Sequence, residues 1–203
     1  MRIATLIGLL TLLLSNSVLG EETFKWNTEE GWRGERIELP ASFAKDMQVK
    51  GVEEIRFAPG MFKPDSPQFF SYVFVFAVNG KDSFTDKVIE RELMTYYKGL
   101  CKAVMRSPNL DVSGFKLSMS KDEKASNGPP NATNLVQYSA KLDWIEPFAT
   151  KKPQKLNFEI QSYSIPDSES SFLFVAASPS NTDTEVWTKM RAVRAAIEHN
   201  PKE

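Results

Sequence analysis

The sequence predicts an α+β fold, in which a mostly antiparallel sheet of about six to seven strands carries one helix on each face. Two segments, 69–78 and 172–177, are apolar at nearly every position, which is typical of central strands that are covered on both sides. Two other segments, 85–106 and 183–198, repeat apolar residues every three or four positions, as amphipathic helices do. Because central strands of this kind need cover on both faces, we place one helix on each side of the sheet.

The first half of the chain consists of short strands and a stiff loop before the first helix. Arg33–Leu39 and Val52–Phe57 alternate apolar and polar side chains, which predicts two strands. Ala58–Pro67 contains three prolines and a glycine, which exclude regular structure and stiffen this loop. The central strand 69–78 follows. Ser83, with Asp86 three residues later, is then placed to cap the first helix with its hydroxyl.

The second half of the chain predicts four more strands and the closing helix. Apolar and polar residues alternate in 113–120, 136–144 and 156–160, which indicates antiparallel strands with one face toward water. The segment 121–133 has no apolar period and is predicted as an exposed loop. After the second central strand, Thr182–Glu185 has the spacing of a capping box at the start of the last helix.

The first twenty residues have the three parts of a secretory signal: Arg2, an apolar run from Ile3 to Leu14, and small residues up to Gly20. We expect cleavage after Gly20. The apolar run is shorter than the roughly 20 residues that span a bilayer, so we expect no membrane insertion after signal removal. Residues 21–32 are predicted as a polar lead-in and 33–200 as a single domain, secreted or periplasmic.

The composition argues against several classes of function. The chain has 25 lysines and arginines against 26 aspartates and glutamates, so no general positive field would attract nucleic acid. His199 and Cys101 are the only histidine and cysteine, which argues against histidine-based catalysis, zinc sites and internal disulfides. Cys101 falls at the edge of the first helix's apolar face, where we expect it to be packed rather than reactive. We therefore predict no catalytic residue, no metal and no cofactor.

Apolar and tyrosine side chains are the first candidates for contact with a ligand or partner. Met61 and Phe62 lie in the proline-stiffened loop, and Phe69 at its far end belongs to the same expected contact region. A stiff loop would lose little entropy on binding, although such residues also pack back onto a core. Tyr96 lies off the main apolar stripe of the first helix. A tyrosine there either covers the edge of the sheet or marks an interface.

Three further candidates, Asp143, Trp144 and Glu146, lie where a predicted strand ends. Ligand-contacting residues gather at such strand ends, and ordinary solvated carboxylates are the alternative for the two acids. Asn131 begins a match to the N-glycosylation acceptor pattern, which matters only in a eukaryotic secretory route.

Neighbouring acids in the second predicted strand cannot act together. Glu53 and Glu54 are adjacent, so they point to opposite faces of the sheet, and one of them faces the core. Glu54 shares its face with Arg56, which predicts an ion pair, with a ligand clamp as the alternative. An enzyme would need Asp143, Glu146 or Glu54 to converge in one concave site with shifted pKa values.

The order of elements resembles the PsbP-like fold. The residues that carry the resemblance are Ile37-Glu38-Leu39-Pro40 leading the early strands, the aromatic strand before the long helix, and 174–179 running into the last helix. This resemblance implies a central antiparallel sheet between helices in an exported protein that binds partners rather than catalyses a reaction. The segments 34–40 and 51–61 are also similar to uncharacterised exported bacterial proteins. Neither resemblance assigns a functional residue.

These observations together favour an exported, non-enzymatic binding module. We expect it to engage an unknown protein or small ligand in the cell envelope or medium through Ala58–Pro67 and the nearby sheet end. Two alternatives stay open. The first is a carboxylate-dependent hydrolase, and the second is a structural envelope component held by a broad exposed apolar patch.

Overall fold

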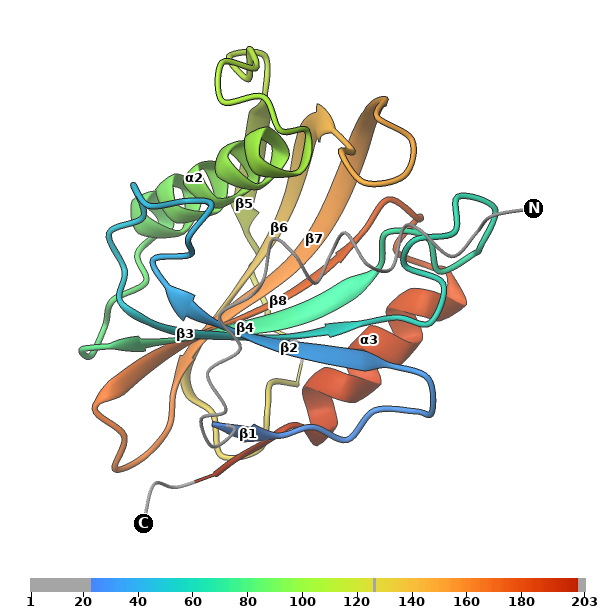
Figure 1. Ribbon diagram of the computed structural model, residues 1–203. Coiled ribbons are helices and arrows are strands. Elements are labelled where there is room, and N and C mark those ends of the chain that lie inside the picture. Colours follow the sequence, from blue (N-terminus) through green and yellow to red (C-terminus); the bar gives the residue numbers. More distant parts are fainter. Residues whose placement is uncertain (1–22, 126, 201–203) are drawn as a thin grey trace.

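A computed structural model describes residues 23–125 and 127–200, which form two helices and two antiparallel sheets (Figure 1). The helices are α2 (Asp86–Val104) and α3 (Glu185–Ala196). The strands are β1 (Phe24–Lys25), β2 (Arg33–Leu39), β3 (Gly51–Phe57), β4 (Tyr72–Asn79), β5 (Lys116–Lys121), β6 (Thr133–Ile145), β7 (Pro153–Ser164), β8 (Ser170–Ser178) and β9 (Glu198–His199). The predicted signal segment 1–20 lies outside the described residues.

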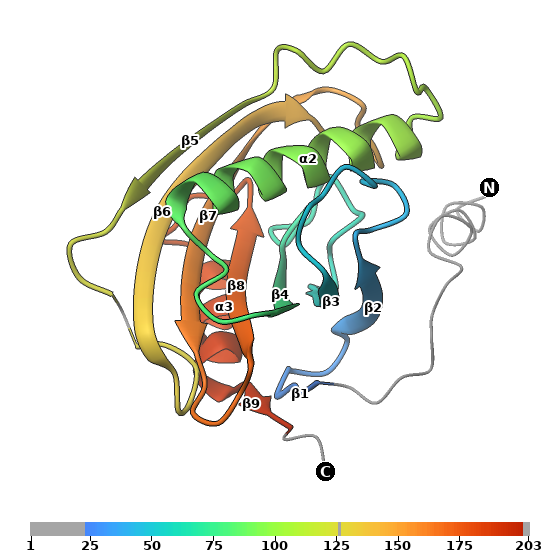
Figure 2. The ribbon, with the colours of Figure 1, turned by 90° about the vertical axis from the view of Figure 1, so that its left-hand side faces the viewer.

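The large sheet has seven strands in the order β2-β3-β4-β8-β7-β6-β5, and each neighbouring pair is antiparallel. The two apolar segments of the sequence become β4 and β8, which pair directly in the middle with Val75 opposite Phe174. Figure 2 shows the sheet curving, with α2 across its hollow side and α3 behind it. The predicted α+β class, strand number and placement of one helix on each face are thus confirmed.

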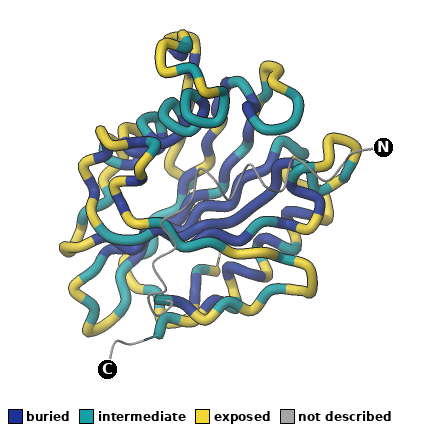
Figure 3. Tube along the Cα trace, viewed as in Figure 1, coloured by how far each residue is buried: buried dark blue, intermediate teal, exposed yellow. Residues whose placement is uncertain are grey.

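Each helix closes its own apolar layer, because residues alternate along the central strands. Tyr72, Phe74 and Phe76 of β4 belong to the core layer under α2. Val73 and Val75 belong to the layer under α3. Buried residues concentrate along these central strands, while exposed residues follow the loops and edges (Figure 3).

The buried stripe of α2 explains how this helix is seated. Ile89, Leu93, Tyr97 and Cys101 repeat every four residues and are fully buried against the sheet. The predicted cap at Ser83 was wrong, because the Ser83 hydroxyl donates to the Gly80 carbonyl oxygen at 2.8 Å. Thr85 is the N-cap, and its Oγ1 accepts a hydrogen bond from the Val88 amide at 3.4 Å.

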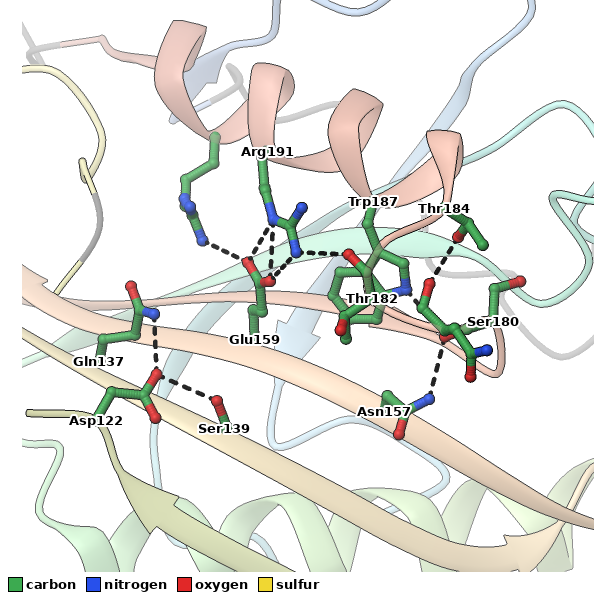
Figure 4. A network of polar contacts seen from close by, with 12 residues as sticks. Asp122, Gln137, Ser139, Asn157, Glu159, Ser180, Thr182, Thr184, Trp187 and Arg191 are labelled. Carbon is green, nitrogen blue, oxygen red and sulfur yellow. Dashed lines mark hydrogen bonds and ion pairs between the residues drawn. The ribbon is translucent and has the colours of Figure 1, made fainter. Parts of the chain in front are cut away.

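A charged clamp on β7 holds α3 in place. Arg191 Nη2 donates to Glu159 Oε1 at 2.6 Å and Arg194 Nη1 donates to Glu159 Oε2 at 3.1 Å, and the arginines come from neighbouring turns of the helix (Figure 4). Trp187 lies fully buried beside this clamp, and its Nε1 donates to the Ser180 carbonyl oxygen at 3.0 Å. The ion pairs and the buried indole together fix the helix to its face of the sheet.

Several predicted boundaries were wrong. The strand predicted to begin at Phe69 begins at Tyr72, because Phe70 has a left-handed backbone with φ of 48° and belongs to the preceding turn. The strand predicted from Ser113 begins at Lys116, after a turn that the Asp111 carboxylate stabilises by accepting from the Ser113 amide. The predicted capping box at α3 is absent: Thr184 is the N-cap, and its hydroxyl donates to the Asn181 carbonyl oxygen instead.

The small sheet joins the two ends of the described chain, and the sequence analysis did not predict it. Phe24 of β1 pairs with His199 of β9, and the Phe24 ring is buried against Phe172. None of the helices in residues 23–125 and 127–200 is both long enough and apolar enough to cross a membrane.

Candidate functional site

An apolar cleft lies between the C-terminal half of α2 and the β2–β3 edge of the large sheet. It encloses about 40 Å³, which by the usual measure is room for a few water molecules. Its walls come from β2, β3 and the start of β4, from the loops on either side of β3 and after β6, and from α2. The lining residues are Glu35, Ile37, Phe43, Ile55, Phe57, Met61, Phe62, Phe70, Tyr72, Tyr96, Leu100, Ala103, Val104 and Phe148.

Aromatic rings build one wall of the cleft. The ring of Phe62 lies 6.2 Å from that of Phe57 and 5.8 Å from that of Phe148, measured between centroids. Phe70 lies 5.9 Å from Phe148 and joins the same cluster. Rings that hold one another in this way are already ordered before anything binds. The proline-rich loop therefore presents Phe62 as a preformed wall rather than a free side chain.

Gly99 of α2 allows the loop between β2 and β3 to run close to the helix beside the cleft. A Cβ atom at Gly99 would lie 2.3 Å from the carbonyl oxygen of Phe43 and 3.0 Å from Ala44 Cα. Only a residue without a side chain lets the loop between β2 and β3 run this close to the helix. This close approach places Phe43 in the wall of the cleft.

Two carboxyl groups face the α2 layer from the β2–β3 edge. Glu35 lines the cleft, and Glu53 is fully buried with its Oε1 accepting a hydrogen bond from Tyr96 Oη at 3.1 Å. In the register of β2 and β3, Glu35 lies opposite Ile55 and Glu53 lies opposite Ile37, so the two acids are diagonal neighbours on one face. The Oε2 atoms of both have no hydrogen-bond partner among the residues that the structure describes.

Burial raises the pKa of both carboxyl groups. Loss of hydration raises the pKa of Glu35 to about 7. Loss of hydration also raises the pKa of Glu53 to about 8, the hydrogen bond from Tyr96 opposes this, and the negative charge of Glu35 adds to it. These two acids therefore carry much less charge at neutral pH than exposed glutamates do.

Three of the six predicted contact residues meet at this cleft. Met61, Phe62 and Tyr96 all line it, although they come from a loop and from a helix far along the chain. Met61 and Tyr96 are each only 4% exposed, so any contact with a ligand would have to occur inside the cleft. Tyr96 also stacks on Phe74 with ring centroids 6.1 Å apart. Their role in binding stays a prediction.

The other three predicted contact residues lie elsewhere and differ from one another. Asp143 is exposed and forms an ion pair with Lys155 at 3.4 Å. Trp144 is buried in the α2 layer, with its Nε1 donating to Gln154 Oε1 at 3.1 Å. Neither residue is part of the cleft wall.

Glu146 is a structural acid that fixes the loop after β6. It is fully buried, and its carboxylate accepts the amides of Phe148, Ala149 and Thr150 together with the Thr150 hydroxyl. The alternative of a solvated carboxylate was therefore wrong for Glu146. The loop that it holds carries Phe148 to the aromatic wall of the cleft.

Glu54 lies on the opposite face of β3 from Glu53, as the alternation predicted. It accepts hydrogen bonds from the Thr23 amide and from Trp26 Nε1, the latter at 2.9 Å. The guanidinium of Arg56 lies over the ring of the same Trp26, 4.7 Å from its centroid. Asp143, Glu146 and Glu54 thus have three separate sets of partners.

The sequence analysis passed over Glu35, although a signal for it was present. In Arg33–Leu39 the alternation places Glu35 on the same face as Ile37 and Leu39, which pack on the α2 layer. A carboxyl group at a core-facing position of a strand marks either a buried polar network or a binding site.

Cys101 is buried in α2 as predicted, and burial followed by the nearby Glu146 charge raises the pKa of its thiol to about 11. Such a thiol is almost entirely protonated at neutral pH and is a poor nucleophile. Within the described ranges, no three or more histidine, cysteine, aspartate or glutamate side chains are grouped to hold a metal ion.

Comparison with known proteins gives structural similarity at low identity. No protein-family model matches the chain, and no curated protein matches it. LpqN of Mycobacterium tuberculosis, described as involved in cell envelope biogenesis, is 14% identical with a TM-score of 0.36, covering 92% of this chain and 88% of LpqN. Cyanobacterial PsbP (CyanoP) from Synechocystis sp. PCC 6803 is 8% identical with a TM-score of 0.37, covering 90% and 96%. The chain thus resembles a PsbP, as its element order indicated, and similarity at this level carries no inference about activity or partners.

Proposed function

We propose that this protein is an exported binding module whose cleft between α2 and the β2–β3 edge receives the end of an apolar chain. The observation that carries this proposal is an apolar cleft with preformed aromatic walls, located where three independently predicted contact residues meet. Export is supported by the signal pattern of the first twenty residues.

The size of the cleft limits what enters it. A space of about 40 Å³ takes the last few methylene groups of a chain, or one slender apolar side chain, rather than a whole folded ligand. Each buried methylene contributes about 0.8 kcal/mol, so the cleft alone would give weak binding that contacts outside it must strengthen.

The polar groups at the cleft suit binding better than hydrolysis. Burial raises the pKa of Glu35 and Glu53 and also the pKa of the Tyr96 hydroxyl. Groups that carry little charge can share hydrogen bonds inside an apolar site at a lower cost than fully ionised groups. Two of the acids that we considered for a hydrolase have other partners. Asp143 forms an exposed ion pair with Lys155, and Glu146 accepts hydrogen bonds from the backbone of the loop after β6.

Binding of octyl glucoside, a neutral amphiphile with an eight-carbon chain, tests the proposal by NMR titration or calorimetry below its micelle concentration. We expect saturable binding to the protein without its signal segment. Ala103→Phe, which fills the cleft from α2, should abolish binding. Phe62→Ala should weaken binding about fivefold while changing the melting temperature by only a few degrees.

Phe69→Ala provides a matched control, because Phe69 lies in the same loop, packs on the same core layer and is not part of the cleft wall. It should leave the affinity unchanged. If Phe62→Ala strongly lowers the melting temperature, Phe62 is a core residue. Absence of any binding to the unmodified protein would overturn the proposal.

A further inference from the structure

A second, more open hollow adjoins the cleft. This groove holds about 600 Å³ and runs between the outer face of α2 and the loop between β2 and β3. Phe43 and Ala103 line both the cleft and the groove, so the two spaces share a wall at these residues. A chain that ends in the cleft would have to pass Phe43 and Ala103 to reach the groove.

The groove is lined by four cations and one acid. Lys98, Lys102 and Arg106 follow one another at a spacing of four along α2 and its C-terminal end, and Lys45 faces them from the loop. None of these four forms an ion pair with any residue in the part of the chain that the structure describes.

The helix dipole explains the position of only some of these four cations. Lys102 lies in the last turn of α2, where a positive charge is favourable next to the negative end of the helix dipole. Lys98 lies one turn earlier and Lys45 lies on another element, so neither gains from that position. Like charges four residues apart on a helix repel each other. An anion in the groove would relieve this repulsion.

We propose that the ligand is a single-chain amphiphile with an anionic headgroup, with its chain end in the cleft and its carboxylate or phosphate on Lys98, Lys102, Arg106 and Lys45. This inference rests on the proposed function and adds the chemistry of the headgroup. Four cations outnumber Asp46, the one acid lining the groove, and Glu35 and Glu53 belong to the sheet side of the cleft.

The test compares four ligands with the same eight-carbon chain by calorimetry at low salt: octyl phosphate, octanoate, octyl glucoside and octylamine. We expect octyl phosphate or octanoate to bind about tenfold more tightly than octyl glucoside, and octylamine to bind most weakly. The ratio of the two anionic ligands distinguishes a phosphate from a carboxylate headgroup. The advantage of the anions should shrink as salt is raised.

A double variant locates the headgroup. Lys98→Gln with Lys102→Gln should lower the affinity for octyl phosphate about tenfold and leave that for octyl glucoside within about twofold. The matched control is Lys116→Gln with Lys141→Gln, which removes the same charge from two positions on the paired strands β5 and β6, outside the lining of the groove. This control should keep the affinity for octyl phosphate.

The outcomes separate this inference from the proposed function. If octyl glucoside or octylamine binds as tightly as the anions, the headgroup assignment is wrong while the cleft remains a binding site. Equal losses in the groove variant and the control would show general charge attraction and would also overturn the assignment. If none of the four ligands binds, both the inference and the proposed function fail.

Discussion

The two faces of the large sheet differ in how completely their helices close them. Under α3, Trp187 and Met190 are fully buried, and Glu159 ties two arginines of the helix to β7. Under α2, the layer contains more aromatic rings but leaves a cleft at the β2–β3 edge. The closed face and the open face belong to one sheet and share β4 and β8.

The difference shows that space for a ligand arises at the edge of an apolar layer rather than in its middle. The centre of the α2 layer is filled by Phe74, Leu93 and Tyr97. At its β2–β3 edge, two core-facing positions carry Glu35 and Glu53 in place of apolar residues, and a loop passes over α2 at Gly99. A layer can thus be well packed in its middle and still be open at one side.

Removing the clamp on the closed face should have the largest effect on stability. Glu159→Ala takes away the carboxylate that Arg191 and the buried Arg194 contact, so we expect a loss of about 3 kcal/mol in the free energy of unfolding. Chemical denaturation measures this loss. Glu169→Ala removes an exposed partner of Lys81 and should change stability by less than about 0.5 kcal/mol. If the two substitutions lowered the free energy of unfolding equally, the Glu159 clamp would not be what holds α3 on the closed face.

The open face should make stability depend on pH. Burial raises the pKa of Glu53 to about 8 from an ordinary value near 4.5, so between these values the folded state binds more protons than the unfolded state. The stabilisation from this proton is complete below about pH 4.5 and is lost as the pH rises through 8. From pH 5 to pH 8 we expect the free energy of unfolding to fall by roughly 3 kcal/mol.

Two glutamine variants check the source of this pH dependence. Glu53→Gln should remove most of it, and Glu35→Gln should remove a smaller part because solvent partly screens that carboxyl group. Glu38→Gln, at an exposed position on β2, should keep the slope of the unmodified protein. If stability instead rises between pH 5 and pH 8, the two acids are ionised in the folded state.

The smallest of these effects concerns the loop that passes over the open face. Gly99→Ala would favour the helix by about 1 kcal/mol, but its Cβ would meet the Phe43 carbonyl oxygen. We expect a net destabilisation of about 1 to 2 kcal/mol and altered binding at the cleft. Gly114→Ala has open space around the added Cβ and should be neutral or slightly stabilising. A stabilising Gly99→Ala would show that the loop moves away freely.

The central elements could be predicted from local patterns, and the cleft could not. A short stretch of sequence is enough to show these patterns. They are the apolar residues on both sides of β4 and β8, and the apolar stripe of α2 that repeats every four positions. The turn at Phe70 and the missing capping box at Thr184 depend on hydrogen bonds that the apolar periodicity does not show. The Phe70 amide donates to the Met61 carbonyl oxygen, and the Thr184 hydroxyl donates to the Asn181 carbonyl oxygen. The cleft depends on a helix, a strand edge and three loops that are far apart in the sequence.

Met61 and Phe62 were candidate contacts because prolines stiffen their loop. Tyr96 was a candidate because it lies off the main apolar stripe of the helix. No local pattern indicated that they would meet, because their contact requires the antiparallel register that places β3 beside β4 under α2. The same register explains Glu35, whose core-facing position was visible in the alternation but whose burial needs α2 and the loop above it.

The amino-acid sequence by itself determined the α+β class, the two central strands, the two amphipathic helices and the balance of charge, since each depends on composition or on a short period. The tertiary structure decided which face is closed and which is open, which acids lose their hydration, and which cations of α2 line the groove. The physical reason is that burial and electrostatic environment depend on side chains brought together across the sheet, and no single segment contains that information.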